Sequence, residues 1–373
     1  MTVAISPKSS IAAGPLADRL AHGERITVLD VREDPEWGIE APGVISRQMS
    51  SSAVSADLAG LARELDGPVV VVCNRGITAQ PVAQALRGVG VDAMAVEDGM
   101  RGWIMALQAR PVELGVQGVL VRQIQRPGRG CLSYLLAAGG NALVVDPAPD
   151  AGFYVALAAE LGARITNIVD THLHADHISG ARMLSEQTGA TLRLPALALE
   201  RGVAYAEHVE PLHDSDTIQL GAVSVNAISL PGQTTDMTGL LIADRALVAG
   251  DSLFLDGIAR PDLQQSDPEG AHRMARLLHG TLRERVLALG EEVLLLPGHA
   301  HPGVNPDAVV APLGDVRAAV PKLAIDDADQ FAAELLSATP PRPANYEAII
   351  AVNAGTRPCD TDLETGGNSC SAR

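Results

Sequence analysis

The chain has 373 residues, of which 47% are hydrophobic and 20% charged, so it is globular in composition but long for one core, and we expect two domains. The formal net charge of -17 argues against nucleic acid and anionic membranes as partners. No stretch approaches the roughly 18 apolar residues of a spanning helix, and the first residues lack the apolar core of a signal peptide. The cysteines form no dense framework, so we expect them to be reduced in a cytoplasmic protein: Cys73, Cys131, Cys359 and Cys370.

The first hundred residues alternate short apolar strands with helices. We expect strands at 26–31, 69–73 and 91–96, and helices at 55–65, 79–89 and 99–107. This alternation predicts an α/β domain with a parallel sheet. A connector at 108–118 follows.

The second part is richer in strands. We expect helices at 152–161 and 178–188, and strands at 120–124, 132–137, 142–145, 165–169, 218–220, 223–230, 239–243, 246–249 and 291–296. Two strand-rich halves interleaved with helices predict a four-layer αββα sandwich rather than a doubly wound sheet. From about residue 305 the chain is rich in Pro and Ala, which predicts a helical extension and a tail.

A cluster of metal-type side chains follows the apolar run 165–169. Within six positions the chain has His172, His174, Asp176 and His177. Burying three imidazoles and a carboxylate this close together carries charge and desolvation costs that a bound metal cation offsets. Histidine with aspartate suits zinc or iron, so the cluster predicts a metal site.

Three later strand ends carry further candidate ligands. They are Gln233, Asp251 and His299, each preceded by glycine. Loops at strand ends are where a rigid scaffold can gather ligands from distant parts of the chain.

These motifs, in this order and spacing, resemble the metallo-β-lactamase superfamily over residues 118–302. The resemblance rests on the HxHxDH run, Gly250-Asp251 and Gly298-His299. It implies the αββα fold, but the superfamily hosts many reactions.

Finer motifs resemble the persulfide dioxygenase branch. They are the run THLHADHISG at 171–180, the segments at 121–124, 131–136 and 144–147, the loop at 257–263 with Arg260 and Asp262, and Asn353 near the carboxyl end. The resemblance implies that a low-molecular-weight thiol persulfide reacts with dioxygen to give sulfite and the thiol. It also implies a substrate loop containing Arg260 and Asp262.

The same resemblance implies one Fe(II) held by His172, position 233 and Asp251. Open positions on such an ion accept dioxygen and a sulfur ligand. The remaining residues of the set would orient the ligands: His174, Asp176, His177 and His299.

Position 233 departs from this pattern, because the family has histidine where this chain has Gln233. Three alternatives follow. Gln233 binds iron through its amide oxygen or a water in an active dioxygenase. Alternatively, zinc sits among Asp176, His177, Asp251 and His299, as in a hydrolase. In the third alternative, a degraded site binds persulfide without turnover.

A cysteine loop follows the apolar strand 69–73. Cys73 precedes a predicted helix, whose N-terminus would stabilise an anionic persulfide. With the LDVRE and DGMRGW segments, this loop resembles a rhodanese domain over residues 11–109. The resemblance implies that Cys73 accepts sulfur, with Arg75 supplying charge, within a loop that also contains Asn74, Gly76, Ile77 and Thr78. Thr78 stands where active members commonly have a basic residue, which puts the binding of thiosulfate in doubt.

The two resemblances together predict a sulfur-metabolism enzyme with a rhodanese-like domain at 11–109, a metallo-β-lactamase-like domain at 118–302 and an extension at 303–373. Fusion raises the effective concentration of a shared sulfur intermediate. Persulfide oxidation would thus be coupled to a sulfurtransferase step. The alternatives are a zinc thioester hydrolase of the glyoxalase II kind and a non-catalytic persulfide-binding module. Assembly as a homodimer is left open.

Overall fold

The computed structural model describes residues 9–33, 35, 37–265, 267–337, 339, 342, 344–364 and 371–372, so Cys370 lies outside the described residues. The chain divides into two compact units. The first is built from the chain up to Gln108 with Gln125–Gly130 and His301–Pro306. The second is built from Ala109–Ile124, Cys131–Ala300 and the chain from Asp307 onward.

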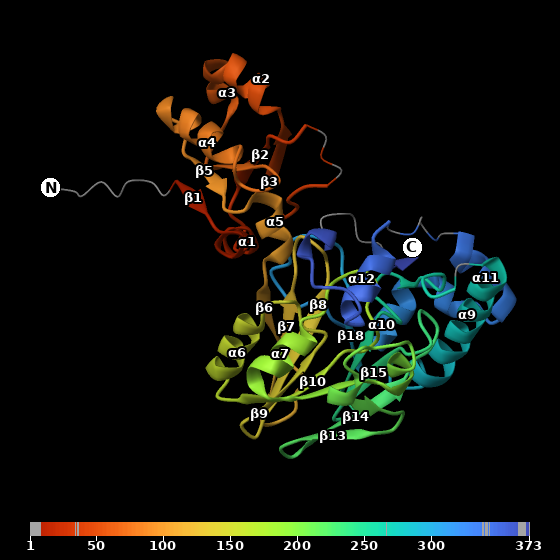
Figure 1. The fold of residues 1–373 in the computed structure, drawn as a ribbon. Coiled ribbons are helices and arrows are strands. Elements are labelled where there is room, and N and C mark those ends of the chain that lie inside the picture. Colours follow the sequence, from red (N-terminus) through yellow and green to blue (C-terminus); the bar gives the residue numbers. More distant parts are fainter. Residues whose placement is uncertain are drawn as a thin grey trace. The chain divides into compact units, whose positions relative to one another are not determined.

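The first unit is a parallel sheet with helices on both faces (Figure 1). Its elements are β1 (Ser10–Ile11), α1 (Ala13–Ala21), β2 (Ile26–Asp30), β3 (Val44–Gln48), α2 (Ser51–Ala56), α3 (Leu58–Glu64), β4 (Val69–Val72), α4 (Ala79–Gly88), β5 (Ala93–Val96) and α5 (Gly99–Met105). The strand order is β1-β5-β4-β2-β3, and all neighbours are parallel.

The valine run of β4 explains this layering. Val70 and Val72 pack on one side with α1 and α5, including Trp103. Val69 and Val71 pack on the other side with α2, α3 and α4. A strand buried on both faces reads as a continuous apolar run, as this one does. The prediction of a parallel α/β first domain is confirmed.

The second unit contains two sheets. Its strands are β6 (Gln108–Val112), β7 (Val119–Gln125), β8 (Leu132–Ala138), β9 (Asn141–Val145), β10 (Arg164–Val169), β11 (Thr191–Pro195), β12 (Glu210–Leu212), β13 (Thr217–Leu220), β14 (Val223–Ser229), β15 (Thr238–Ile242), β16 (Ala246–Gly250), β17 (Ile258–Ala259), β18 (Leu294–Pro297), β19 (Ala311–Pro312) and β20 (Ser371–Ala372). One sheet has the order β12-β11-β10-β9-β8-β7-β6 and the other β13-β14-β15-β16-β18-β19, while β17 pairs with β20.

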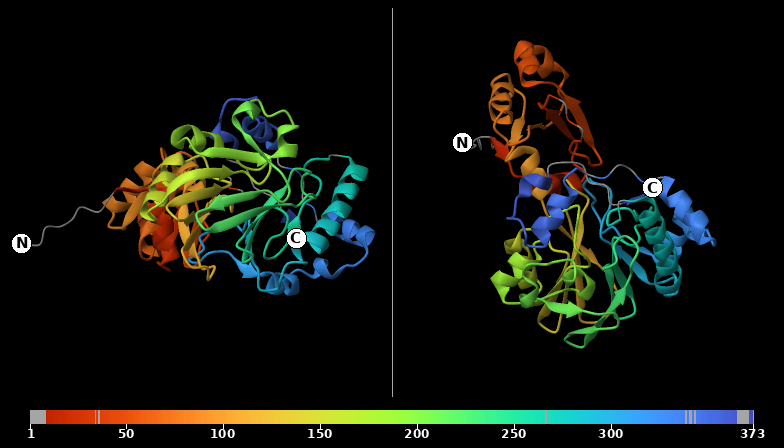
Figure 2. Two further views of the ribbon diagram at one scale, coloured as in Figure 1. Left: turned by 90° about the horizontal axis from the view of Figure 1, so that it is seen from below. Right: turned by 45° about the vertical axis from the view of Figure 1, so that its right-hand side comes forward.

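Helices cover the outer faces of both sheets (Figure 2). They are α6 (Ala151–Glu160), α7 (Ala181–Thr188), α8 (Ala196–Leu199), α9 (Pro268–Thr281), α10 (Leu313–Ala319), α11 (Ala328–Ser337) and α12 (Tyr346–Asn353), with short turns at Ala206–His208, Leu282–Val286, Pro321–Ala324 and Thr361–Glu364. Tyr134 and Val225 belong to the core between the sheets, whereas Leu278 and Phe331 bring α9 and α11 onto the outer face of the second sheet. The αββα prediction is confirmed.

Three predicted elements differ in the structure. The helix expected at 55–65 is interrupted at Asp57, whose carboxylate caps α3 by accepting the Gly60 N–H at 2.8 Å. The connector at 108–118 contains β6, an edge strand that tolerates Pro111 because edge positions need not donate a hydrogen bond. The helix expected from Ile178 begins at Ala181, because side chains from the carboxyl end hold the preceding residues in the loop.

None of the helices in the described part of the chain has the length and apolar character needed to span a bilayer.

Candidate metal centre and cysteine loop

The histidine cluster occupies the loop between β10 and α7, and this loop is pinned to the end of β9. All residues from Thr171 to Ile178 are buried. The Thr171 N–H donates to Asp146 Oδ1 at 2.7 Å, and the Gly180 N–H donates to the Pro147 carbonyl at 2.7 Å. Because β9 and β10 are parallel neighbours, the loop is held at the carboxyl edge of the β6–β12 sheet of the second unit.

Hydrogen bonds set the tautomer of His172. Thr171 Oγ1 donates to Asp146 Oδ2 at 2.9 Å and lies 3.0 Å from His172 Nδ1. Since the hydroxyl proton is used on the carboxylate, the Thr171 oxygen accepts Nδ1–H, which leaves a lone pair on Nε2. Burial and the neighbouring His174 hold the pKa of His172 well below its usual value. His172 is therefore a neutral imidazole with Nε2 ready to bind a metal.

His172 Nε2 and the Gln233 amide both approach Asp251 Oδ2. Asp251 Oδ2 lies 3.8 Å from His172 Nε2 and accepts Gln233 Nε2 at 3.0 Å. Both His172 Nε2 and Gln233 Oε1 are buried without a hydrogen-bond partner among the described residues. A buried lone pair on nitrogen and one on oxygen, beside a carboxylate, form a donor set that a cation satisfies.

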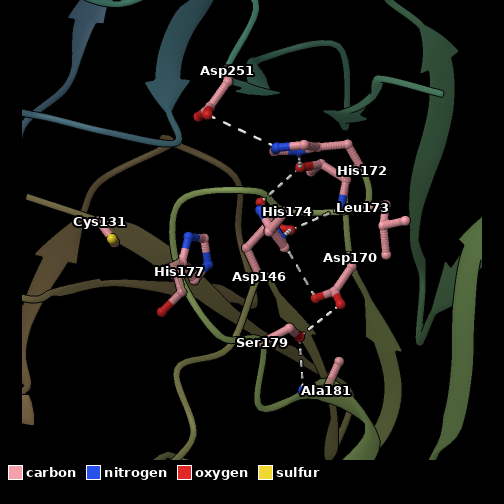
Figure 3. Close-up of polar contacts among 12 residues, drawn as sticks. Cys131, Asp146, Asp170, His172, Leu173, His174, His177, Ser179, Ala181 and Asp251 are labelled. Atoms are coloured by element: carbon pink, nitrogen blue, oxygen red, sulfur yellow. Dashed lines mark hydrogen bonds and ion pairs between the residues drawn. The ribbon is translucent and has the colours of Figure 1, made fainter. Parts of the chain in front are cut away.

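Two carboxylates hold the His174 ring at its Nε2. Its Nε2 lies 3.1 Å from Asp146 Oδ1 and 3.8 Å from Asp170 Oδ1 (Figure 3). Burial disfavours its charged form, but these two carboxylates raise its pKa well above the usual value. His174 Nδ1 has no partner in the described structure, and the His174 and His172 rings are 4.1 Å apart. His174 therefore carries positive charge directly beside the His172 ring.

A second group forms around Asp176. Its Oδ2 lies 3.0 Å from His177 Nδ1, 2.8 Å from His299 Nε2 and 3.9 Å from the Cys131 sulfur. Figure 3 shows this sulfur beside the His177 ring. His299 Nδ1 lies 2.7 Å from Asp251 Oδ1, which joins this group to the His172 group.

Mutual attraction outweighs burial in this second group. Burial is the largest effect on each side chain and opposes its charge, yet His177 and His299 hold the pKa of Asp176 well below its usual range. Asp176 raises the pKa of His177 to about 9 despite burial. Burial likewise opposes ionisation of Cys131, but His177 and His299 lower its pKa to about 6.

Two glycines allow the strand ends to approach each other. Gly250 has φ 51°, and a Cβ there would lie 2.8 Å from Thr171 Oγ1. A Cβ on Gly298 would lie 2.4 Å from Asp251 Oδ1. Glycine in front of the candidate ligands Asp251 and His299 is therefore a steric requirement of the site.

The carboxyl-terminal extension holds the metal loop. Asn353, the last residue of α12, donates to the carbonyls of His174 and His177 at 2.9 and 2.8 Å, and its Oδ1 accepts the Ser179 N–H at 2.9 Å. The fully buried Glu364 accepts the preceding loop N–H at 3.0 Å. These contacts fix the loop backbone and, through it, the directions of the imidazoles.

The predicted substrate loop contains an ion pair between a buried arginine and a partly exposed aspartate. Arg260 is fully buried, and its Nε and Nη2 reach the two oxygens of Asp262 at 2.8 and 3.0 Å. Arg342 Nε approaches Asp262 Oδ2 at 3.5 Å. This pairing fixes the orientation of Arg260, and its role toward a substrate stays a prediction.

Cys73 lies directly after β4, at the carboxyl edge of the first unit's sheet. Its carbonyl accepts the Met100 N–H at 2.8 Å, and a Cβ on Gly99 would lie 2.0 Å from that oxygen. The loop passes through Gly76 at φ 76° and reaches α4, with exposed side chains at Asn74, Arg75, Ile77 and Thr78. The predicted strand–loop–helix setting of the cysteine is present.

The structure thus brings all seven predicted metal-site residues together: His172, His174, Asp176, His177, Gln233, Asp251 and His299. Three features of the site were not predicted from the sequence: Cys131, the hydrogen bonds of Thr171 to Asp146 and His172, and Glu364. A single cysteine at the start of a strand carries no local signal. Glu364 acts 186 residues from its partner Ile178, so only the tertiary structure reveals it.

Two family models match the chain. Residues 126–299 match the metallo-beta-lactamase superfamily, and residues 13–106 match the rhodanese-like domain. Together with the buried histidine and aspartate groups, these matches identify a metal-binding site in the second unit.

Curated relatives fall into two groups. The chain is 28% identical over 240 residues to the persulfide dioxygenase ETHE1 of Bos taurus, covering 63% of this chain and 87% of the relative. The human protein of the same name is 27% identical with the same coverage. A hydroxyacylglutathione hydrolase of Acidiphilium cryptum is 31% identical over 207 residues, covering 54% of this chain and 83% of the relative.

Solved structures agree on the fold. ETHE1 from Myxococcus xanthus has a TM-score of 0.55 at 26% identity, covering 64% of this chain and 99% of that one. A metallo-beta-lactamase from Staphylococcus aureus has a TM-score of 0.58 at 22% identity, covering 64% and 73%, which supports the fold alone.

Proposed function

This chain belongs to the metallo-beta-lactamase superfamily and carries a rhodanese-like domain ahead of that fold, and on this premise we propose that it oxidises a thiol persulfide to sulfite. The observation that carries the proposal is the convergence of His172 Nε2 and the Gln233 amide on Asp251 Oδ2, with His172 Nε2 and Gln233 Oε1 both buried and unpartnered among the described residues. The similarity to ETHE1 persulfide dioxygenases over 240 residues supports it.

The three residues fit one Fe(II) ion. A neutral imidazole, an amide oxygen and a carboxylate provide three protein donors and leave positions open, and iron bound there would supply the redox chemistry that dioxygen requires. Gln233 replaces an imidazole donor with a harder, weaker one, so we expect lower iron affinity than a second histidine would give.

The overall reaction balances as RSS⁻ + O2 + H2O → RSH + SO3²⁻ + H⁺. The outer sulfur gives four electrons to dioxygen, the sulfur–sulfur bond breaks, and the released thiolate takes one proton from water. His174, charged by its two carboxylate neighbours, would attract the persulfide anion toward the site. Thr171 keeps the His172 lone pair on Nε2, and His299 orients Asp251 through a 2.7 Å contact.

The rhodanese-like domain would handle the same sulfur. We propose that the Cys73 thiolate attacks the outer sulfur of a persulfide, forming a Cys73 persulfide and releasing the thiol. Cys73 forms no disulfide among the described residues, and this chemistry requires a thiol, which favours a reducing compartment such as the cytoplasm. With Thr78 in place of a basic residue, we expect thiol persulfides to be better donors than thiosulfate.

The decisive experiment combines metal analysis with oxygen uptake. Protein purified anaerobically from iron-replete cells is assayed with glutathione persulfide, following oxygen and sulfite. We expect bound iron and equal amounts of oxygen consumed and sulfite formed. Zinc without iron, and no oxygen uptake, would refute the proposal.

Variants at position 233 test the ligand set. Gln233→Ala should lose iron, and Gln233→His should gain iron affinity and activity. Gln219→Ala, an exposed glutamine on β13, is the matched control and should change neither. For the first domain, cyanide-dependent sulfur release that survives in Cys73→Ser would exclude Cys73 as the nucleophile.

A zinc thioester hydrolase is the second candidate. The similarity to a hydroxyacylglutathione hydrolase and the grouping of Asp176, His177 and His299 favour it. The same preparation should then hydrolyse S-lactoylglutathione without consuming oxygen. Binding of glutathione persulfide without either reaction would instead indicate a non-catalytic module.

A further inference from the structure

A buried carboxylate outside the candidate metal ligands holds the backbone of the histidine loop. Asp236 lies in the connection between β14 and β15, three residues after Gln233, and its side chain is fully buried. Its Oδ2 accepts the Leu173 N–H at 2.8 Å. Because Leu173 stands between His172 and His174, this bond acts directly on the backbone of the loop that presents the imidazoles.

A second bond from the same connection holds the other side of His172. The Thr238 N–H donates to the Thr171 carbonyl at 2.8 Å. Both peptide groups that flank His172 are therefore bound by the segment that carries Gln233. Because the two anchors and Gln233 belong to one short segment, they fix the separation between the candidate ligands His172 and Gln233.

Arg201 supplies the charge that the buried carboxylate requires. Its Nη1 donates to Asp236 Oδ1 at 2.6 Å, and its side chain is only 20% exposed. A carboxylate removed from water is costly unless an opposite charge and hydrogen bonds compensate it, and here each oxygen has a donor. The charged Asp236 can thus face the Leu173 N–H, and such a hydrogen bond is stronger than a neutral one.

The side chain of Leu173 is anchored in the same neighbourhood. It belongs to one buried cluster with Ala198 and Val203, which precede and follow Arg201 along the chain. In Figure 3 this side chain points away from His177. The residue between the first two histidines is therefore held at its N–H and at its side chain, so the loop cannot turn here without breaking a buried contact.

We propose that Asp236 is a positioning residue, which sets where His172 Nε2 stands relative to the Gln233 amide. Its oxygens are used by the Leu173 N–H and by Arg201, so it acts through the loop backbone rather than as a ligand. Groups that orient metal ligands are commonly needed for full metal affinity. The inference rests on the proposed function only in taking His172 and Gln233 as ligands of one metal ion.

The test separates the hydrogen-bond acceptor from the charge, with Co(II) as the probe on the full chain. The signal of this site is the part of the visible cobalt absorption that His172→Ala abolishes. Asp236→Ala removes the acceptor and should weaken Co(II) binding about 10–100-fold and shift these bands. Asp236→Asn keeps an oxygen for the Leu173 N–H and should bind Co(II) within about threefold of the parent.

Arg201 variants test whether the charge has a role of its own. Arg201→Met leaves the carboxylate buried without its counter-charge, so it should bind Co(II) about tenfold more weakly. The double variant Asp236→Asn/Arg201→Met removes both charges but keeps the acceptor, so it should recover most of the parent affinity.

Asp214 offers a matched control. Its Oδ1 also accepts a backbone N–H, from Ser229 at 2.7 Å, and an arginine, Arg285, at 2.6 Å. Both side chains of this pair are exposed and lie outside the histidine loop. Asp214→Ala should therefore leave the Co(II) affinity and the cobalt bands as they are in the parent.

Hydrogen exchange of the metal-free proteins gives a readout that needs no bound metal. The loop peptide that contains Leu173 should exchange faster in Asp236→Ala, and at the parent rate in Asp236→Asn. If Asp236→Ala does not fold, the comparison of Arg201→Met with the double variant takes its place.

Parent-like Co(II) affinity and bands in Asp236→Ala, or a double variant that binds no better than Arg201→Met, would overturn the proposal. Iron content and oxygen uptake are measured on the parent protein. Their failure would refute the dioxygenase proposal, but it would leave the cobalt and hydrogen-exchange results, and with them this inference, unaffected.

Discussion

Asn353→Ala would weaken metal binding from a position on another element of the second unit. Asn353 makes three hydrogen bonds to the metal loop, two from its Nδ2 to carbonyls and one from the Ser179 N–H to its Oδ1. Each such bond contributes about 1 kcal/mol net, so the side chain holds the loop by about 3 kcal/mol. A substitution in the shell around metal ligands typically lowers affinity 10–100-fold, which is about 1.4–2.8 kcal/mol and lies within that limit.

The measurement is the zinc dissociation constant of the full chain, obtained by competition with a chromophoric chelator at neutral pH. Asn226→Ala is the matched control, because Asn226 only accepts a bond from Thr217 on the exposed side of a strand pair, at 2.9 Å. We expect the control to bind as the parent does. Asn353→Asp keeps the acceptor for Ser179 but turns a carboxylate toward two carbonyls, so it should bind no better than Asn353→Ala.

An Asn353→Ala protein that retains the parent circular dichroism and binds zinc within about twofold of the parent would contradict this prediction. That result would mean that the loop keeps its conformation without the extension, through its anchors at the end of β9 alone.

Two further predictions concern the same centre. Thr171→Val removes the hydroxyl that sets the imidazole tautomer and should lower metal affinity about 10–100-fold in the chelator assay, whereas Thr166→Val on the preceding strand β10 should not. Gly298→Ala puts a Cβ 2.4 Å from the carboxylate of Asp251, a candidate ligand, and should abolish stoichiometric metal binding measured by elemental analysis, whereas Gly280→Ala, with open space around it, should have no such effect.

Much of the fold followed from local patterns. The buried β4 run and the strand-rich second half led to the parallel sheet and the αββα sandwich that the structure has. Boundaries were less predictable where side chains compete with helix formation. Asp57 interrupts a helix by capping the next one, and α7 begins at Ala181 because Asn353 and Glu364 occupy the preceding N–H groups.

The residues of the candidate site also divide into those that local patterns predict and those that they do not. The HxHxDH spacing places His172, His174 and His177 in one loop whatever the rest of the chain does. Glycine before Asp251 and before His299 marked two further strand ends, and the structure shows both glycines to be steric necessities. These features are local, because spacing along a loop or a strand decides which side chains leave the backbone together.

By itself, the sequence thus determined two α/β units, a histidine loop after β10 and a cysteine loop after β4. Only the tertiary structure decided what each site atom faces. The Cys131 sulfur reaches Asp176 because Cys131, just before β8, forms an isolated antiparallel bridge with His299, just beyond β18. Gln233 meets Asp251 because β14 and β16 end at the same edge. Such contacts depend on strand register between distant segments, which no local pattern specifies.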